Sequence, residues 1–196
     1  MKIAIAQIIS FLFNPILLLV FVPLLLVYKS TGNIVSAFIW TVYTMIFLLT
    51  LVFFIIYGVH KKLFTDMDVS KRTQRPLLFI VCLVMGLLYL WGLFFLNGPK
   101  ILMVIVIGLI ISVLLASLIN FKIKASIHVA TVSALLFALA IVYQGYYYIA
   151  LLLIPTVAWS RLTIKRHTLP ETIVGGCFGI LLSLGVYLFV THIYMH

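Results

Sequence analysis

The chain alternates long runs of apolar residues with short polar interruptions. A helix needs about 20 apolar residues to cross the hydrocarbon core of a bilayer, where its backbone hydrogen bonds must be made within the segment. The pattern therefore predicts an all-α fold, a polytopic bundle of about seven transmembrane helices. The runs, of which the fifth and sixth are the shortest, cover residues 4–27, 35–58, 77–96, 101–121, 128–143, 146–160 and 171–191.

The connections between these runs are short. None is long enough to fold alone, so residues 1–196 are predicted to form a single integral membrane domain. The first run begins like a signal peptide, but it is long and carries Asn14-Pro15 near its middle. We therefore expect a retained first helix that kinks at this proline.

The polar residues gather in three segments, at residues 60–76, 122–128 and 160–171. Two predicted spans separate the first segment from the second, and two more separate the second from the third. An even number of crossings returns the chain to the same face of the membrane. We therefore expect all three segments to meet at one face.

Composition supports the membrane assignment and predicts which side of the membrane the charged face occupies. Hydrophobic residues make up 66% of the chain and charged residues 8%, which is outside the range of soluble domains. Of the 13 lysines and arginines, only Lys29 and Lys100 fall on the face opposite the polar segments. The positive-inside rule then predicts that these segments face the cytoplasm, and we expect a bacterial or archaeal plasma membrane protein.

The formal net charge of +10 would suit a nucleic acid partner in a soluble chain. No aromatic and basic surface exists outside the predicted spans, so nucleic acid is not an expected partner. Cys82 and Cys177 fall within apolar runs and lack Cys-x-x-Cys spacing. We expect them to be buried thiols rather than a disulfide or a metal site.

Candidate chemistry is concentrated in residues 160–171. The chain has three acidic residues, and one of them, Glu171, follows His167 by four positions. In the first turn of a helix this spacing places both side chains on one face. The carboxylate can then hold one imidazole nitrogen as N–H and leave the other as a nucleophile or base. With Arg161 and two further cations nearby, the segment suits a phosphate better than a metal ion.

The other two polar segments contain groups that phosphoryl transfer would need. His128 can protonate a leaving oxygen, while Ser126, Arg75 and Arg161 can donate hydrogen bonds to a phosphate. Lys71 lies four residues before Arg75, so one helical turn would aim both side chains in the same direction. Because these cations can neutralise phosphate oxygens, the predicted site needs no metal and no other cofactor.

In these residues the chain resembles the type 2 phosphatidic acid phosphatase (PAP2) superfamily, whose three motifs read K-x6-RP, PSGH and SR-x5-H-x3-D. The third motif is matched by Ser160-Arg161, His167 and Glu171, with glutamate in place of aspartate. The resemblance covers about residues 60–190. It therefore implies a PAP2-like core preceded by two N-terminal spans.

The other two motifs are matched in part. The family's Pro-Ser-Gly-His reads Ala-Ser-Ile-His at residues 125–128. The first motif keeps Arg75-Pro76, but Asp68 stands where the family has a lysine. Aspartate would repel a phosphate, so either Lys71 takes the role of that lysine or the pocket is remodelled.

The resemblance implies a membrane phosphatase that hydrolyses a lipid phosphate or an isoprenoid (di)phosphate through a phosphohistidine intermediate, without a metal. His167 would be the nucleophile, Glu171 its orienting carboxylate and His128 the general acid. The residues that would bind the substrate phosphate are Arg75, Arg161, Ser126 and Lys71. Familiar members of the family place this site on the outer or lumenal face, in contrast to the charge bias described above.

Two other interpretations stay open. The first is a non-catalytic membrane protein of the same fold that binds a lipid or an anion. The second, more distant, is a prenyltransferase-like enzyme, which Asp66-x-Asp68 would indicate, although such enzymes need two acidic loops to hold their magnesium ions. Thr168-x-x-Glu171 is also typical of a capping box at the start of the last span, a role that is compatible with catalysis.

Overall fold

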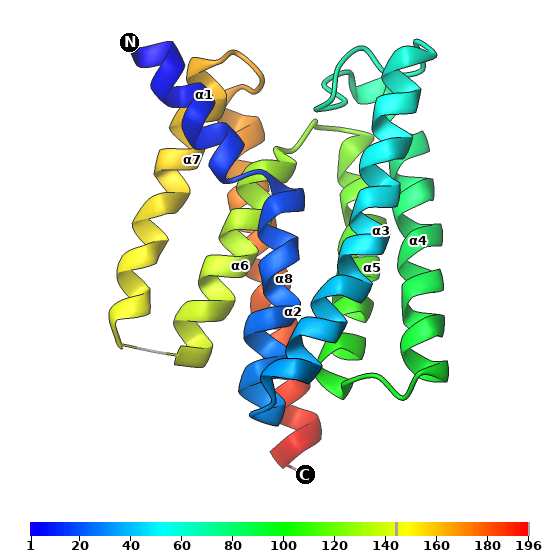
Figure 1. Cartoon of the computed structure of the whole chain (residues 1–196). Coiled ribbons are helices and arrows are strands. Elements are labelled where there is room, and N and C mark those ends of the chain that lie inside the picture. The colour runs from blue at the N-terminus through cyan, green and yellow to red at the C-terminus, as the bar shows by residue number, and fades with distance from the viewer. Residues whose placement is uncertain (144, 196) are drawn as a thin grey trace. The chain divides into compact units, whose positions relative to one another are not determined.

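The computed structural model describes residues 1–143 and 145–195, and in this part of the chain the regular secondary structure is entirely helical (Figure 1). The predicted all-α class is therefore confirmed. The α-helices are α1 (Lys2–Leu12), α2 (Pro15–Thr31), α3 (Ile34–His60), α4 (Arg75–Phe95), α5 (Lys100–Asn120), α6 (Ile127–Tyr143), α7 (Leu153–Thr163) and α8 (Leu169–Met195). Two 3₁₀ segments precede α4 and α7, namely η1 (Arg72–Gln74) and η2 (Gly145–Leu152).

Among the described residues, five helical stretches are long and apolar enough to cross a membrane: Lys2–Thr31, Ile34–His60, Arg72–Phe95, Lys100–Asn120 and Leu169–Phe189. The predicted spans at 128–143 and 146–160 are helical but shorter. Helix α6 has 17 residues, and α7 has 11 residues after the 3₁₀ segment η2. The structure thus fits an integral membrane protein with several membrane-spanning helices, while a count of seven spans stays a prediction.

The first apolar run is divided into two helices at the expected place. Helix α1 ends at Leu12, and Pro15 is the first residue of α2, where the missing N–H of proline removes no helical hydrogen bond. The side-chain oxygen Oδ1 of Asn14 accepts a hydrogen bond of 2.9 Å from the backbone N–H of Ile16. The kink predicted at Asn14-Pro15 is therefore confirmed, and it is a break between two helices.

The chain divides into two compact units. The terminal unit contains Met1–Leu18 and Ile123–His196, and the middle unit contains Leu19–Lys122. In the middle unit, α4 packs against α3 and α5. Its core includes Tyr89, whose hydroxyl is 2.8 Å from Oγ1 of Thr44, so this buried polar group is paired in apolar surroundings.

In the terminal unit, α8 packs along α6, and α1 packs against α7. Four buried residues form its apolar core, Val129, Val132, Leu136 and Val157, with side chains of α1 packed against them. The N-terminal helix therefore contributes to the same packed unit as the C-terminal third of the chain.

Two glycines allow the close approach of α8 to α6. A Cβ atom at Gly175 would lie 2.6 Å from the backbone oxygen of Ser126, and one at Gly179 would overlap the carbonyl of Ala130. Small residues four apart permit such contact between membrane helices. The glycines thus bring the N-terminal turns of α6 and α8 together.

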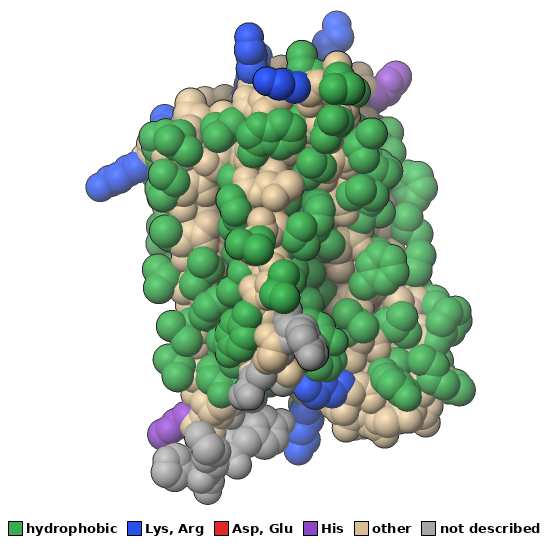
Figure 2. Space-filling model, turned by 90° about the vertical axis from the view of Figure 1, so that its left-hand side faces the viewer, with side chains coloured by type: hydrophobic (Ala, Val, Ile, Leu, Met, Phe, Trp, Pro, Cys, Tyr) green, Lys and Arg blue, Asp and Glu red, His purple; other side chains and the backbone are tan. Residues whose placement is uncertain are grey.

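Large apolar side chains are exposed along the helices, as expected where lipid takes the place of water. Figure 2 shows one face on which hydrophobic side chains predominate and lysines and arginines lie mainly toward the ends. Both cysteines are free, and Cys177 is exposed, so the prediction of a buried thiol was wrong there. Cys177 lies two residues from each packing glycine and therefore points away from the α6 contact.

Candidate functional site

His167 and Glu171 form the centre of the candidate site. Nδ1 of His167 lies 2.9 Å from Oε2 of Glu171, and the side chain of His167 is 3% exposed. A carboxylate can only accept a hydrogen bond, so Nδ1 carries the proton, and in the neutral form of the imidazole Nε2 then carries the lone pair. The predicted contact of this pair is therefore confirmed, but the two residues do not share a helical turn, because α8 begins at Leu169 and His167 precedes it.

The same carboxylate oxygen caps α8. Oε2 of Glu171 accepts a hydrogen bond of 3.0 Å from the backbone N–H of Thr168, which is the glutamate half of a capping box. The helix start thus fixes the position of Glu171, and Glu171 in turn orients His167. Capping and histidine orientation are performed by one side chain.

The connection between α7 and α8 folds back sharply to place His167. The carbonyl oxygen of Arg161 accepts hydrogen bonds from the backbone N–H groups of Arg166 and His167, at 3.1 and 3.4 Å. Lys165 adopts a left-handed conformation with φ of 56°. This turn returns the chain beside the end of α7 before α8 begins.

Arg161 is 2% exposed and projects from the last turn of α7. Its Nη1 donates a hydrogen bond of 2.7 Å to Oγ of Ser10 on α1. Sequence reasoning did not identify Ser10 as a partner. The available signal was weak, since Ser10 is one of few polar residues in the first apolar run.

Ser126 and His128 belong to the start of α6, in the same unit as His167. The backbone N–H of Ser126 donates a hydrogen bond of 3.0 Å to the carbonyl oxygen of Glu171, which ties the second motif segment to the third. Ser126 is fully buried, and its hydroxyl has no hydrogen-bond partner among the described residues. His128 is 8% exposed. The terminal unit therefore contains five of the predicted site residues.

Arg75 and Lys71 belong to the middle unit. Arg75 is 3% exposed at the start of α4, and its Nε donates a hydrogen bond of 3.3 Å to the carbonyl oxygen of Val69. Lys71 is exposed and extended, with φ of −77° and ψ of 123°, and it precedes the 3₁₀ segment η1. The expectation that Lys71 and Arg75 share one helical turn was wrong, because α4 begins only at Arg75. Their binding of phosphate stays a prediction.

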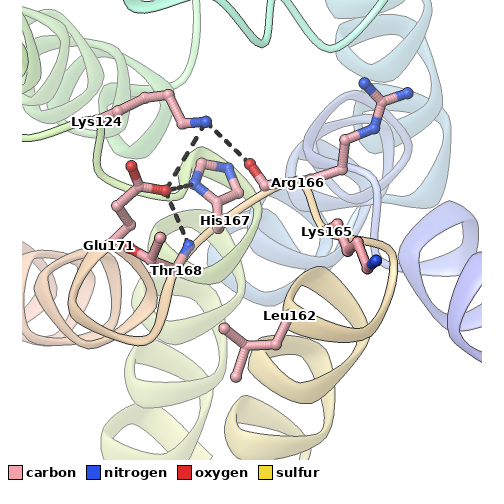
Figure 3. Close-up of a pocket in the computed structure, with 7 residues that line it drawn as sticks. All are labelled: Lys124, Leu162, Lys165, Arg166, His167, Thr168 and Glu171. Atoms are coloured by element: carbon pink, nitrogen blue, oxygen red, sulfur yellow. Dashed lines mark hydrogen bonds and ion pairs between the residues drawn. The ribbon is translucent and has the colours of Figure 1, made fainter.

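Within the terminal unit, a pocket of about 300 Å³ opens beside the imidazole (Figure 3). The residues that line it are Lys124, Leu162, Lys165, Arg166, His167, Thr168 and Glu171. Three of the seven are permanent cations and one is a carboxylate, so the pocket favours an anion. Among the described residues, no three His, Cys, Asp or Glu side chains come together as metal ligands would.

Lys124 is the member of this pocket that sequence reasoning missed. Its Nζ donates a hydrogen bond of 2.9 Å to the carbonyl oxygen of Arg166 and lies 3.8 Å from Oε2 of Glu171. The available signal was its position two residues before Ser126, within a polar segment already identified as part of the site.

The fold and the composition define an all-helical integral membrane protein with a buried histidine and carboxylate pair in a cation-rich pocket. Comparisons with models of protein families, with curated proteins and with solved structures found no match.

Proposed function

We propose that the protein is a membrane phosphatase of the PAP2 type, which hydrolyses a lipid phosphate or an isoprenoid (di)phosphate through a phosphohistidine intermediate. The observation that carries the proposal is the 2.9 Å contact between Nδ1 of His167 and Oε2 of Glu171. This contact leaves Nε2 as the nucleophilic nitrogen of a buried imidazole. The adjacent pocket is rich in cations, which suits the charge of a phosphate.

The buried donors around the histidine support a phosphate as the ligand. The guanidinium of Arg161 is held by Ser10 and is therefore positioned before a ligand arrives. The hydroxyl of Ser126 is buried without a partner among the described residues, an arrangement that costs free energy unless a ligand supplies the missing hydrogen bond. We assign both groups to binding of the phosphate oxygens.

The proposed reaction has two steps. In the first, Nε2 of His167 attacks phosphorus, the P–N bond forms, and the bond from phosphorus to the leaving oxygen breaks as His128 protonates that oxygen. In the second, a water oxygen attacks phosphorus while His128 takes a proton from the water. The P–N bond then breaks, which releases inorganic phosphate and regenerates His167. The exposed apolar helices would hold the lipid chain near the membrane surface.

The test is phosphate release by the purified protein from phosphatidate or a prenyl diphosphate in the presence of EDTA. We expect His167→Ala to lower kcat by at least about 10³-fold, because no other group forms the covalent intermediate. We expect His128→Ala to lower kcat by about 10²- to 10⁴-fold, the usual contribution of a general acid. His60→Ala is the matched control, since His60 is exposed at the end of α3 in the middle unit, and it should keep wild-type activity.

Three other results would each contradict the proposal. Unchanged release by the His167→Ala variant would refute the phosphohistidine mechanism. Phosphate binding without release from any of these substrates would favour the non-catalytic alternative. Magnesium-dependent turnover that is lost in Asp66→Ala and Asp68→Ala would favour the prenyltransferase-like alternative.

A further inference from the structure

Lys124 is a cation of the candidate site that the family motifs do not include. It lies in the connection between α5 and α6, two residues before Ser126. Its side chain is 20% exposed, and its ammonium group is fixed by the carbonyl oxygen of Arg166 at 2.9 Å. The connection between α7 and α8 therefore holds this cation in place beside the catalytic pair.

The side chain of Lys124 points in a different direction from those of Lys165 and Arg166, the other two cations of the pocket. Figure 3 shows its ammonium group turned toward the imidazole of His167 and the carboxylate of Glu171, whereas the side chains of Lys165 and Arg166 point away. A phosphate that meets His167 in this pocket would therefore meet Lys124 before either of the other cations.

The ammonium group has donors left for a ligand. A lysine ammonium has three N–H donors, and the carbonyl oxygen of Arg166 accepts one of them. The distance of 3.8 Å to Oε2 of Glu171 is an ion-pair distance, longer than a hydrogen bond. That oxygen already accepts hydrogen bonds from His167 and from Thr168. Lys124 is thus partly neutralised but can still donate to a phosphate oxygen.

We propose, building on the proposed function, that Lys124 binds the substrate phosphate and supplies the positive charge that the family motif places where this chain has Asp68. Lysine binds phosphate as a point charge, so the contact depends on a fixed position close to the reacting group. Lys124 is fixed by its bond to the carbonyl oxygen of Arg166, 3.8 Å from the carboxylate that orients His167 and in the lining of the same pocket. The loss of the lysine at position 68 is in this way compensated within the terminal unit.

The test uses the purified full-length chain and inorganic phosphate as the probe, with binding measured as protection against thermal unfolding. We expect Lys124→Gln to weaken phosphate binding by about 10- to 100-fold, because a charge-assisted hydrogen bond is lost. The same variant should raise KM for phosphatidate by a similar factor. Glutamine can still donate to the carbonyl oxygen of Arg166, so the melting temperature without phosphate should stay close to that of the wild type.

Two further variants separate charge from general effects of substitution. Lys124→Arg keeps the charge and should keep phosphate binding within about tenfold of the wild type. Lys122→Gln removes an exposed lysine two residues upstream and should leave phosphate binding unchanged.

Wild-type phosphate affinity in Lys124→Gln would overturn the inference, as would a large drop in melting temperature with phosphate affinity retained. Failure of the proposed function has a separate signature, since the wild type would then bind phosphate without releasing any from a substrate.

Discussion

At the scale of single residues, one oxygen atom controls the candidate nucleophile. Oε2 of Glu171 accepts hydrogen bonds from Nδ1 of His167 and from the backbone N–H of Thr168, and Lys124 lies 3.8 Å away. All three groups bring positive charge or a donor to the same point. An ionised carboxylate accepts only, so it fixes the proton of the imidazole on Nδ1.

Replacement of Glu171 by glutamine tests this control. An amide donates as well as accepts, so it no longer holds the proton of His167 on Nδ1, and the nucleophilic lone pair of Nε2 is lost in part of the molecules. We expect Glu171→Gln to lower kcat by about 10²- to 10⁴-fold. Because glutamine still accepts a hydrogen bond from Thr168 in a capping box, the free energy of unfolding should change little.

Glu171→Ala provides the comparison. It removes both the cap and the orientation of His167, so it should lower kcat as Glu171→Gln does and also cost about 1 kcal/mol of stability. Steady-state kinetics and thermal unfolding of both variants are the measurements. A glutamine variant with wild-type kcat would show that the carboxylate serves only as a helix cap.

The residues that could be predicted from the sequence are those whose contacts are local. His167 and Glu171 are four apart, and the capping turn at the start of α8 brings them together. The contacts of Lys124 with Arg166 and of Arg161 with Ser10 join residues 42 and 151 positions apart. These pairs depend on which helices pack together, and periodicity does not encode that information.

At the scale of helices, the contact between α6 and α8 determines how the second and third motif segments meet. Gly175 and Gly179 leave room for the backbone of α6, and the backbone N–H of Ser126 reaches the carbonyl oxygen of Glu171 at 3.0 Å. This bond joins the backbones of the second and third motif segments directly. A larger residue on the glycine face should therefore disturb the site as well as the packing.

Alanine substitutions on α8 test this contact. We expect Gly179→Ala to lower stability by about 1–3 kcal/mol, because its methyl group would overlap the carbonyl of Ala130. We also expect a loss of phosphatase activity, since the start of α6 must move. Gly185→Ala is the matched control on the same helix, where a methyl group meets nothing within 4 Å.

Melting temperatures in detergent and the rate of phosphate release are the measurements for both variants. Gly185→Ala should keep the wild-type rate of phosphate release and melt no lower than the wild type, because alanine favours a helix more than glycine does. Equal melting temperatures for the two variants would mean that close packing on the Gly179 face does not stabilise the unit.

A hydrophobic run does not determine where the helix within it begins. Residues 146–160 are apolar throughout much of their length, yet α7 begins only at Leu153 and is preceded by the 3₁₀ segment η2. Pro155 accounts for this, because its ring would clash with the carbonyl of Leu151 in a continuous α-helix. The break at Asn14-Pro15 was predictable, since proline there follows a capping residue and begins a helix.

At the scale of the whole molecule, the sidedness of the site does not depend on whether α6 and α7 each cross the bilayer completely. The start of α6 and the end of α7 lie together, because Lys124 donates to the carbonyl oxygen of Arg166 and Ser126 to that of Glu171. The chain therefore leaves this end of the terminal unit along α6 and returns to it along α7 (Figure 1). Five or seven spans give the same parity, so the expectation that the polar segments share one face of the membrane is the same for both counts.

This parity predicts the location of the C-terminus. Helix α8 begins at the site, and its stretch Leu169–Phe189 is long and apolar enough to cross the membrane. The predicted topology puts only Lys29 and Lys100, of the 13 lysines and arginines, on the face away from the polar segments, so we propose that the site faces the cytoplasm. The C-terminus is then expected on the outer side of the membrane.

Reporter fusions in a bacterial host provide the measurement. A phosphatase reporter that is active only outside the cytoplasm should be active when fused after residue 195 and inactive when fused after Lys62, which lies in the first polar segment. A fluorescent protein that matures only in the cytoplasm should give the opposite result at both positions. A fluorescent C-terminal fusion would place the site on the outer face, where the familiar PAP2 enzymes have it, and would show that the excess of lysine and arginine serves phosphate and headgroup binding rather than orientation.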